Sequence, residues 1–524
     1  MKKQLAAVVG CITVLTGTGI QLPAAAQTLT AETLDYYTAW KEAYLRKNPY
    51  ITDEDQYYVF YGEQTYEQAQ ETVPVTVSEA HGYGMLIAAM MSGYDPDAKD
   101  IFDGMYRYYL AHPSSIGPHL MAWQQSDNGE SLIDTDGTDS ATDGDLDIAY
   151  SLLLADSLWG SGGTINYLQA AKLMIADIME YEINHVRWTP QLGDWAHRPG
   201  EENIEHNPGV WGGAGGWSSE TEDEYPYTGA VRTSDLILQY FPVFAEVTGD
   251  EHWTYVYNAC NGIVHYQTTY TKYGLLPDFF MPNHTGGWSY VPPNFLEGDG
   301  DGSYSYNACR TPWRIGTDAL LWHNEEAQIY AEMVNACIKE DCGGDPKQIK
   351  AGYDQVWGRA NVSWSDLCFT APLMISAAAA GDTEFHDAIR KEVLEIGVDS
   401  YYGNTIAMLC LITDDGGWLM PDREQIPGDI NHDFKTDIAD IYALRGFLLA
   451  DRTVLNDWRA GDLNGDGRLD AVDYALLRRL VLRLQGSGQE TGTEMQTTAV
   501  SAPPEESSET VRTEQTTEPA VPEP

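Results

Sequence analysis

Carboxylate side chains stand at the start of two helix-like stretches, and carboxylates placed this way can transfer protons. Asp143, Asp145 and Asp147 open a segment whose apolar residues follow helical spacing as far as Trp159. Glu79 stands in the same way before a second apolar run. We therefore expect two core-facing helices whose first turns point carboxylates into the space above them. The alternative is that these acids only cap the helices and complement their dipoles.

A third stretch, residues 295–310, is rich in glycine and aspartate and contains Glu297, Asp299 and Asp301. Its spacing lacks the closing bidentate acid of a calcium loop, so we do not expect a metal here. Taken one at a time, these acids are also compatible with a solvated loop. Asn307 stands three residues before Arg310 at the end of this stretch.

Residues 77–85 and 140–150 together resemble two segments of glycoside hydrolase family 8, and residues 295–318 extend the resemblance up to about residue 422. The resemblance implies an all-α fold, an (α/α)6 barrel, and hydrolysis of glycosidic bonds with inversion. Inversion requires an acid that protonates the leaving oxygen and a base that deprotonates water on the opposite ring face, roughly 6.5–9.5 Å away.

On the acid side, the resemblance implies that Glu79 is the general acid and that Asp143 binds the distorted sugar at the cleavage point. A helix N-terminus lowers the pKa of a carboxyl group, which works against an acid. A second carboxylate nearby raises that pKa again, and Asp143 is the natural neighbour of Glu79.

On the base side, many members of the family carry an aspartate three residues before the arginine. This chain has Asn307 there, and an amide cannot take a proton from water at useful pH. A branch of the family that this sequence resembles places a glutamate on an inserted loop just upstream. Glu297 is therefore the predicted base, with Asp299 and Asp301 as competing candidates.

Aromatic rings are expected to pack on the apolar faces of sugar rings. By the same resemblance, the predicted substrate-binding residues are Tyr83, Trp123, Asn307 and Arg310. Further tryptophans are weaker candidates, and core packing is the alternative for each of them: Trp188, Trp195, Trp211 and Trp217.

The order of the segments predicts the domain organisation. Residues 1–26 have the charged, apolar and small-residue regions of a signal peptide, and residues 27–422 form the catalytic domain. In the catalytic domain, helical patterns run over 165–179, 234–248, 318–337 and 366–380. A linker (423–428), a small domain (429–484) and a disordered Thr/Ser/Glu/Pro-rich tail (485–524) are expected to follow.

The small domain contains two calcium-loop-like segments, 429–440 and 462–473, each leading into an amphipathic helix. Positions 1, 3, 5, 9 and 12 carry oxygen side chains, and position 7 supplies a backbone carbonyl. Phe434 stands where the sharp turn favours glycine. The predicted ligands of two Ca²⁺ ions are Asp429, Asn431, Asp433, Lys435, Asp437 and Asp440 in the first loop and Asp462, Asn464, Asp466, Arg468, Asp470 and Asp473 in the second.

This duplicated unit resembles a type I-like dockerin, which implies a cohesin domain of a scaffoldin as partner. By the same resemblance, partner contacts come from the helices and from the loop ends near 438–439 and 471–472. Without calcium, a domain with so few core residues is expected to unfold.

Composition restricts the partners. The sequence has 30 Lys and Arg against 79 Asp and Glu, a net charge of −49, which disfavours nucleic acid. Past the signal peptide, no segment reaches the ~18 uninterrupted apolar residues of a membrane span. Six cysteines remain without a paired metal pattern; Cys337 and Cys342 are either bridged locally or free and buried.

The sequence therefore predicts a secreted endo-glycosidase that hydrolyses β-1,4-linked or mixed-linkage β-1,3-1,4-glucan without a catalytic cofactor. A dockerin would tether its monomeric catalytic domain to a cellulosome, outside the cell or at the cell surface. The alternatives are a chitosanase or an endo-xylanase of the same family. Asn307 leaves a further alternative, a catalytically silent carbohydrate-binding component.

Overall fold

The computed structural model describes residues 29–62, 64–135, 137–196, 227, 229–283, 285–421, 427–430, 436–449, 458–464 and 468–487. The predicted signal peptide, Trp211, Trp217 and the predicted tail from residue 488 onward lie outside the described residues. Four of the predicted calcium ligands also lie outside them: Asn431, Asp433, Lys435 and Asp466.

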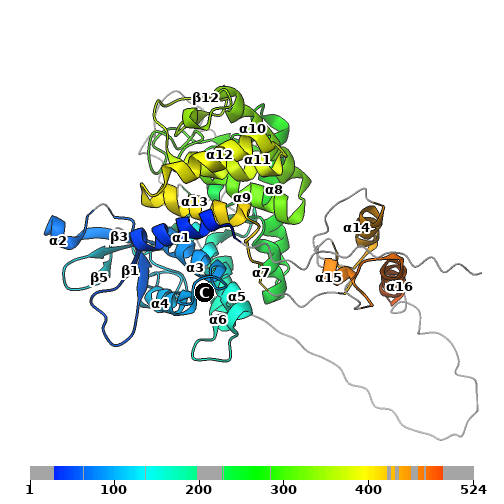
Figure 1. Cartoon of the computed structure of the whole chain (residues 1–524), viewed down its shortest axis with the longest axis horizontal. Coiled ribbons are helices and arrows are strands. Elements are labelled where there is room, and N and C mark those ends of the chain that lie inside the picture. The colour runs from blue at the N-terminus through cyan, green and yellow to red at the C-terminus, as the bar shows by residue number, and fades with distance from the viewer. Residues whose placement is uncertain are drawn as a thin grey trace, which may run out of the picture.

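Helices dominate the fold, and along residues 29–421 they alternate between two kinds (Figure 1). One kind is buried mainly along one face, as expected of an outer layer: α1 (Ala31–Tyr44), α4 (Ala98–Ala111), α6 (Tyr167–Asp177), α8 (His252–Tyr270), α10 (Glu325–Asp341) and α12 (Thr383–Ile396). The other kind is buried over most of its residues: α3 (Ser78–Met90), α5 (Thr142–Trp159), α9 (Thr311–Trp322), α11 (Leu367–Ala379) and α13 (Tyr401–Asp414).

The buried helices pack against one another in series. α5 contacts α3, α3 contacts α13, α13 contacts α11, and α11 contacts α9. Between α5 and α9 stands the 3-10 turn η4 (Thr233–Asp235), which contacts both, followed by the short helix α7 (Phe241–Thr248). An inner set of helices thus surrounds one apolar core, as the predicted all-α architecture requires.

The connections between the helices contain short strands, which pair into sheets of two or three strands. β3 (Val73–Val77) runs directly into α3 and pairs with β4 (Gln124–Asp127), which pairs with β5 (Leu132–Asp134). β9 (Phe279–Pro282) lies between β8 (Val231–Arg232) and β10 (Trp288–Tyr290). Three two-stranded pairs complete this set: β1 (Leu45–Lys47) with β2 (Tyr57–Val59), β6 (Ile183–Asn184) with β7 (Thr189–Pro190), and β11 (Tyr353–Asp354) with β12 (Arg359–Ala360).

Short helical turns occupy several connections. They are α2 (Tyr66–Ala69), the π-helix η1 (Ile178–Glu182), and the 3-10 turns η2 (Asp194–Ala196), η5 (Ala308–Arg310) and η6 (Pro346–Gln348).

Two of the four predicted helical segments are confirmed, as α6 and α11. The prediction over 318–337 is wrong, because the chain breaks between α9 and α10. His323 adopts a left-handed conformation (φ 52°), and the Asn324 side chain then caps α10. The prediction over 234–248 holds only for α7, since 3-10 geometry replaces the first turns of the expected helix.

The six cysteines past the predicted signal peptide are free and buried, so Cys337 and Cys342 do not form a disulfide. Among the described residues, no helix is both long and apolar enough to cross a lipid bilayer.

The small C-terminal domain has its own apolar core, built from α14 (Ile438–Leu448), α15 (Trp458–Gly461) and α16 (Ala471–Ser487) (Figure 1). Its buried residues include Ile430, Leu444, Phe447, Leu469 and Leu477. The two helices predicted after the loops are therefore confirmed, and both begin about three residues earlier than expected.

Candidate active site

Two glycines bring the starts of α3 and α5 together. A Cβ atom on Gly82 would lie 2.9 Å from the Gly144 carbonyl oxygen, and a Cβ atom on Gly144 would lie 2.6 Å from the Ser78 carbonyl carbon. Only glycine allows the two backbones to approach this closely. The first turns, which carry Glu79 and Asp143, therefore lie side by side, as the sequence predicts.

Neither acid is a helix cap. The N-cap residues are Val77 and Ala141, and neither has a side-chain capping hydrogen bond. Asp143 instead accepts a hydrogen bond at Oδ1 from the Gly144 N–H (2.9 Å), which leaves Oδ2 for the site.

The expectation that all three aspartates of α5 point into the site is wrong for two of them. Asp145 is two residues from Asp143 and faces a different direction, whereas Asp147, four residues on, shares the Asp143 face one turn deeper in the helix. Asp145 accepts the Met121 N–H (2.9 Å), and Asp147 forms a buried ion pair with Arg314 (2.5 Å). Asp143 alone among them bonds to Arg310, which also bonds to Glu79.

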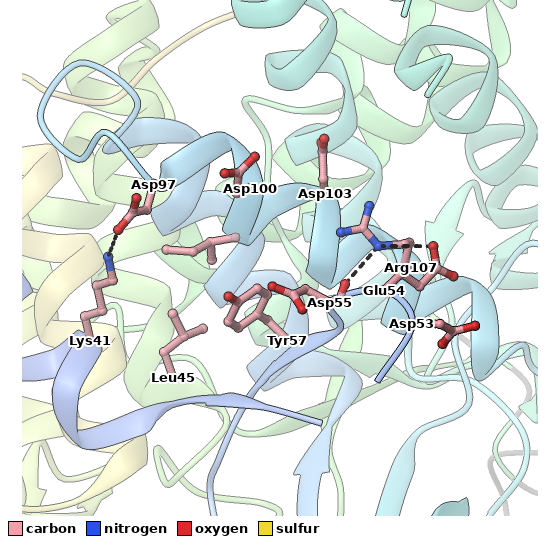
Figure 2. Close-up of a pocket in the computed structure, with 11 residues that line it drawn as sticks. Lys41, Leu45, Asp53, Glu54, Asp55, Tyr57, Asp97, Asp100, Asp103 and Arg107 are labelled. Carbon is pink, nitrogen blue, oxygen red and sulfur yellow. Dashed lines mark hydrogen bonds and ion pairs between the residues drawn. The ribbon is translucent and has the colours of Figure 1, made fainter. Parts of the chain in front are cut away.

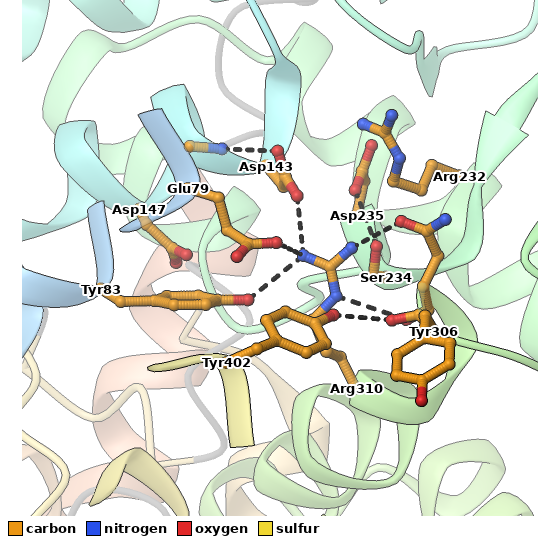
Figure 3. A network of polar contacts seen from close by, with 12 residues as sticks. Glu79, Tyr83, Asp143, Asp147, Arg232, Ser234, Asp235, Tyr306, Arg310 and Tyr402 are labelled. Carbon is orange, nitrogen blue, oxygen red and sulfur yellow. Dashed lines mark hydrogen bonds and ion pairs between the residues drawn. The ribbon is translucent and has the colours of Figure 1, made fainter. Parts of the chain in front are cut away.

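Arg310 is the centre of the site (Figure 3). Its Nη1 atom donates to Glu79 Oε2 and to Asp143 Oδ2, both at 2.7 Å, and Nη2 donates to Asn307 Oδ1 at 2.8 Å. Its side chain is only 2% exposed. A buried guanidinium in a fixed orientation therefore joins the acid side of the site to residue 307.

Glu79 has the environment of a general acid. Burial raises its pKa, the Arg310 charge lowers it, and the Asp143 charge raises it, with a result of about 7. The Tyr401 hydroxyl donates to Glu79 Oε1 (3.1 Å). Burial would also raise the pKa of Asp143, but Arg310 and Arg232 hold that pKa below its usual value. Two adjacent carboxyl groups thus take different protonation states near neutral pH.

Glu297 lies on the opposite side of residue 307. Asn307 Nδ2 donates to Glu297 Oε2 (2.7 Å), and Arg232 Nη2 donates to Glu297 Oε1 (3.0 Å). The Glu297 side chain is 46% exposed. The structure therefore brings Glu79, Asp143 and Glu297 into one connected network, with Asn307 holding both Arg310 and Glu297.

The loop that carries Glu297 is organised by Asp301. This buried aspartate accepts backbone N–H groups from residues 296, 297 and 298 at 2.7–3.0 Å. Asp299 is exposed and accepts the Asn294 side-chain amide (2.6 Å). Asp301 thus bonds to backbone N–H groups, and Asp299 bonds to a side chain of its own turn. Glu297 is the one of the three acids that bonds to Asn307 and Arg232.

Two residues that sequence reasoning missed, Arg232 and Asp235, adjoin the network. Figure 3 shows the Asp235 carboxyl group between Asp143 and Arg232. Its Oδ2 atom is buried and unpartnered within the described residues, and burial together with Asp143 raises the Asp235 pKa to about 8. Asp235 is on η4 and Arg232 directly precedes it, in a stretch without a recognisable motif, so no sequence signal pointed to either.

Tyr83 does not face substrate as predicted. It is fully buried, and its hydroxyl accepts a hydrogen bond from Arg310 Nη1 (3.2 Å). Tyr83 therefore supports the Arg310 side chain from within the protein. Trp123 is half-buried, and its carbonyl oxygen accepts the Ser78 N–H (2.8 Å), which places this residue beside Glu79.

Of the weaker tryptophan candidates, Trp188 stacks on His252 at 4.8 Å, outside the network. Trp195 packs with Tyr227 in a small apolar cluster that includes Leu296, next to Glu297.

A separate polar cavity of about 630 Å³ lies between the first helix and α4 (Figure 2). Its acids are largely paired: Lys41 contacts Asp97 (3.9 Å), and Arg107 contacts Glu54 (3.8 Å). None of the predicted site residues lines it.

In the small domain, the described part of each calcium loop has the features that such a loop needs. The position-12 acids Asp440 and Asp473 are fully buried and accept backbone N–H groups of their own loops. Position 9 caps the following helix through Asp437 or Asp470. These oxygen donors are the kind that Ca²⁺ prefers, so the residues fit the ion.

Comparison with known proteins identifies the family. Residues 22–208 match the model of glycosyl hydrolases family 8. A beta-glucanase of Niallia circulans is 37% identical over 387 residues, which cover 73% of this chain and 83% of the relative. The chain belongs to glycosyl hydrolase family 8. It is therefore a glycoside hydrolase, as its sequence predicts.

Other relatives and solved structures agree with this membership. Endoglucanase A of Acetivibrio thermocellus is 28% identical over 416 residues, 78% of this chain and 73% of that protein. The structure of a beta-1,3-1,4-glucanase from Paenibacillus sp. X4 superimposes with a TM-score of 0.64 at 36% identity, covering 77% of this chain and 97% of the other. A cold-adapted family 8 xylanase shares the fold at 15% identity (TM-score 0.58).

These comparisons confirm the predicted (α/α)6 barrel, the architecture of the family 8 structures. Residues 427–482 match the dockerin type I domain, so the predicted second domain is also confirmed.

Proposed function

We propose that this family 8 enzyme is an inverting endo-glycosidase that hydrolyses β-1,4-linked or mixed-linkage β-1,3-1,4-glucan. The observation that carries the proposal is the network in which Arg310 bonds Glu79 and Asp143 while Asn307 bonds both Arg310 and Glu297. The names of the relatives, a beta-glucanase and several endoglucanases, favour glucan as substrate.

In this mechanism Glu79 donates its proton to the glycosidic oxygen as the bond to the anomeric carbon breaks. Glu297 takes a proton from a water molecule whose oxygen bonds to that carbon from the opposite face. A pKa of about 7 keeps a large share of Glu79 protonated at neutral pH. Glu297 is 46% exposed, so a water molecule can reach its carboxyl group, and Arg232 and Asn307 hold that group in place.

Asp143 is assigned to the sugar at the cleavage point. Its Oδ2 atom is held by Arg310 beside Glu79, and the low pKa keeps it ionised. Such a carboxylate can accept a hydrogen bond from a sugar hydroxyl and stabilise the positive charge that develops in the transition state. Asn307 takes no proton and orients the base through its side-chain amide.

The charges of the site do not decide the substrate, because three carboxyl groups, Glu79, Asp143 and Glu297, share the two guanidinium groups Arg232 and Arg310. The preference for glucan therefore rests on the relatives, a beta-glucanase and several endoglucanases. Chitosan and xylan remain alternative substrates within the family.

We propose further that the dockerin holds two Ca²⁺ ions and binds a cohesin, so that the enzyme works outside the cell in a cellulosome. Asp440 and Asp473 would close the two sites. Each Ca²⁺ ion would hold the ligands of one loop together and so stabilise the fold of that loop and the helix that follows it.

The test compares Glu297→Gln with Asp299→Asn, an exposed acid two residues away on the same loop. Reducing-sugar release is measured on barley β-glucan, carboxymethylcellulose, xylan and chitosan. Glu297→Gln should lower kcat by about 10²–10⁴-fold, whereas Asp299→Asn should keep at least half of it. Hydrolysis of neither glucan by the wild-type enzyme, or equal losses in both variants, would refute the proposal.

A further inference from the structure

Asp278 is a buried aspartate that adjoins the base side of the network. It directly precedes β9. Its Oδ1 atom accepts the backbone N–H groups of Ser305 (3.0 Å) and Ala308 (2.7 Å), which stand before and after Asn307 in the chain. One carboxylate oxygen therefore closes the turn that carries Asn307, through charge-assisted hydrogen bonds.

The backbone of the same residue joins two further segments. The Asp278 carbonyl oxygen accepts the Thr233 N–H (3.0 Å), and Thr233 directly follows Arg232. The Asp278 N–H donates to the Ser303 carbonyl oxygen (2.8 Å), on the stretch that also carries Glu297. β8 and β9 pair antiparallel at this point, so the contact belongs to a sheet. Asp278 thus bonds to three segments that are separate in the chain.

These three segments hold the predicted base. One carries Glu297 itself, and the other two carry Arg232 and Asn307, whose side chains bond to the two oxygens of the Glu297 carboxyl group. Burial raises the pKa of the Asp278 carboxyl to about 7, against the effect of its N–H donors, and the Glu297 charge raises that pKa as well. The two carboxyl groups are therefore close enough to interact electrostatically.

We propose that Asp278 is a positioning residue for the general base. It fixes the Arg232 and Asn307 segments relative to each other, and these two side chains set where the Glu297 carboxyl group stands. The inference rests on the proposed function, because it takes Glu297 as the base. The support has a catalytic consequence, since a misplacement of about 1 Å can cost about 100-fold in rate.

Two substitutions change this support to different degrees. Asp278→Asn keeps an accepting oxygen but loses the charge, and it should lower kcat on barley β-glucan about tenfold. Asp278→Ala removes the acceptor and should lower kcat about 100-fold. KM should change less than about twofold in both variants, because the sugar-binding residue Asp143 keeps its bonds to Gly144 and Arg310. Circular dichroism establishes that each variant is folded at the assay temperature.

The matched control is Asp318→Asn. Asp318 is also a fully buried aspartate, on α9, and it accepts the Asn324 side-chain amide (2.8 Å). None of its printed bonds reaches Glu79, Asp143 or Glu297 within the described part of the chain. The control should keep at least half of kcat.

A double-mutant cycle separates positioning from a general structural defect. All variants are assayed on a dinitrophenyl cello-oligosaccharide, whose leaving group needs no proton. In the Glu79→Gln background, Asp278→Asn should lower kcat about tenfold. In the Glu297→Gln background it should lower the residual kcat less than about twofold, because the group that it positions is already inactive. A structural defect would lower kcat equally in both backgrounds.

Unchanged kcat in both Asp278 variants, an equal loss in the Asp318 control, or equal effects in the two backgrounds would each overturn the positioning role. The two proposals fail differently. If Glu297→Gln loses turnover while Asp278→Asn and Asp278→Ala keep it, only the positioning role is wrong. If Glu297→Gln hydrolyses β-glucan at the wild-type rate, the proposed base is wrong, and the positioning role fails with it.

Discussion

The acid side and the base side of the site are held in different ways. Glu79 is on a buried helix, is 16% exposed, and contacts Arg310 and Tyr401. Glu297 is on a loop, is 46% exposed, and is held by Asn307 and Arg232. An acid needs burial to keep its proton at neutral pH, whereas a base needs access to the water molecule that it activates. The fold thus supplies two environments for two glutamates.

The largest effect should come from removing the acid. Glu79→Gln is expected to lower kcat on β-glucan by about 10²–10⁴-fold, because no group then protonates the leaving oxygen. Activity should recover substantially on a dinitrophenyl cello-oligosaccharide, whose leaving group needs no proton. Glu297→Gln should recover little on that substrate, since its defect lies in activating water. Equal recovery of both variants would remove the distinction between the two sides.

A smaller loss is expected when the base loop loses its internal support. Asp301→Asn replaces a carboxylate that accepts three backbone N–H groups around Glu297, and charge-assisted hydrogen bonds are the stronger kind. We expect kcat to fall about tenfold, with KM nearly unchanged. The exposed Asp299→Asn serves as the control, and equal kcat values for the two variants would show that Asp301 does not position the base.

The acid side can be tuned through its neighbour. Because the Asp143 charge raises the pKa of Glu79, Asp143→Asn should lower that pKa from about 7. Glu79 acts only when protonated, so the alkaline limb of kcat/KM against pH should move to lower pH. The shift is measured on the residual activity of the variant. An alkaline limb that stays at the same pH or moves to higher pH would contradict the electrostatic coupling of the Asp143 and Glu79 carboxyl groups.

The smallest effect on catalysis should follow calcium removal. This experiment tests whether the barrel works independently of the dockerin. EDTA should unfold residues 427–487, seen as increased proteolysis there, and abolish cohesin binding. Hydrolysis of soluble β-glucan should change less than twofold, because the predicted calcium ligands all belong to the dockerin and none belongs to the catalytic network. A parallel loss of hydrolysis would show that the two domains depend on each other.

Local pattern predicted one side of the site well. Glu79 and Asp143 each begin an apolar helix, and a helix start fixes the direction of its first-turn side chains. The prediction of Glu297 as the base depends on the family resemblance and on the presence of an amide, Asn307, at the usual position of the base. In contrast, Arg232 ends the two-residue strand β8 and Asp235 lies on the 3-10 turn that follows it; neither belongs to a periodic pattern, and only the folded chain brings them to Asp143.

The errors have physical reasons as well. Asp145 and Asp147 share the first part of α5 with Asp143, but Asp145 points to another side of the helix, and Asp147, one turn further on, is paired with Arg314. Tyr83 looked like a sugar ligand by position, yet it lies fully buried beneath Arg310. The break at His323 depends on a left-handed residue that does not interrupt the apolar pattern.

The most direct test of the division between the two glutamates is the pH dependence of kcat/KM on natural β-glucan, whose leaving oxygen needs a proton. The wild-type enzyme should show an alkaline limb with a pKa of about 7. In the residual β-glucan activity of Glu79→Gln that limb should be absent, because the titrating acid is gone. An alkaline limb that remains near pH 7 in this variant would show that another group is the acid.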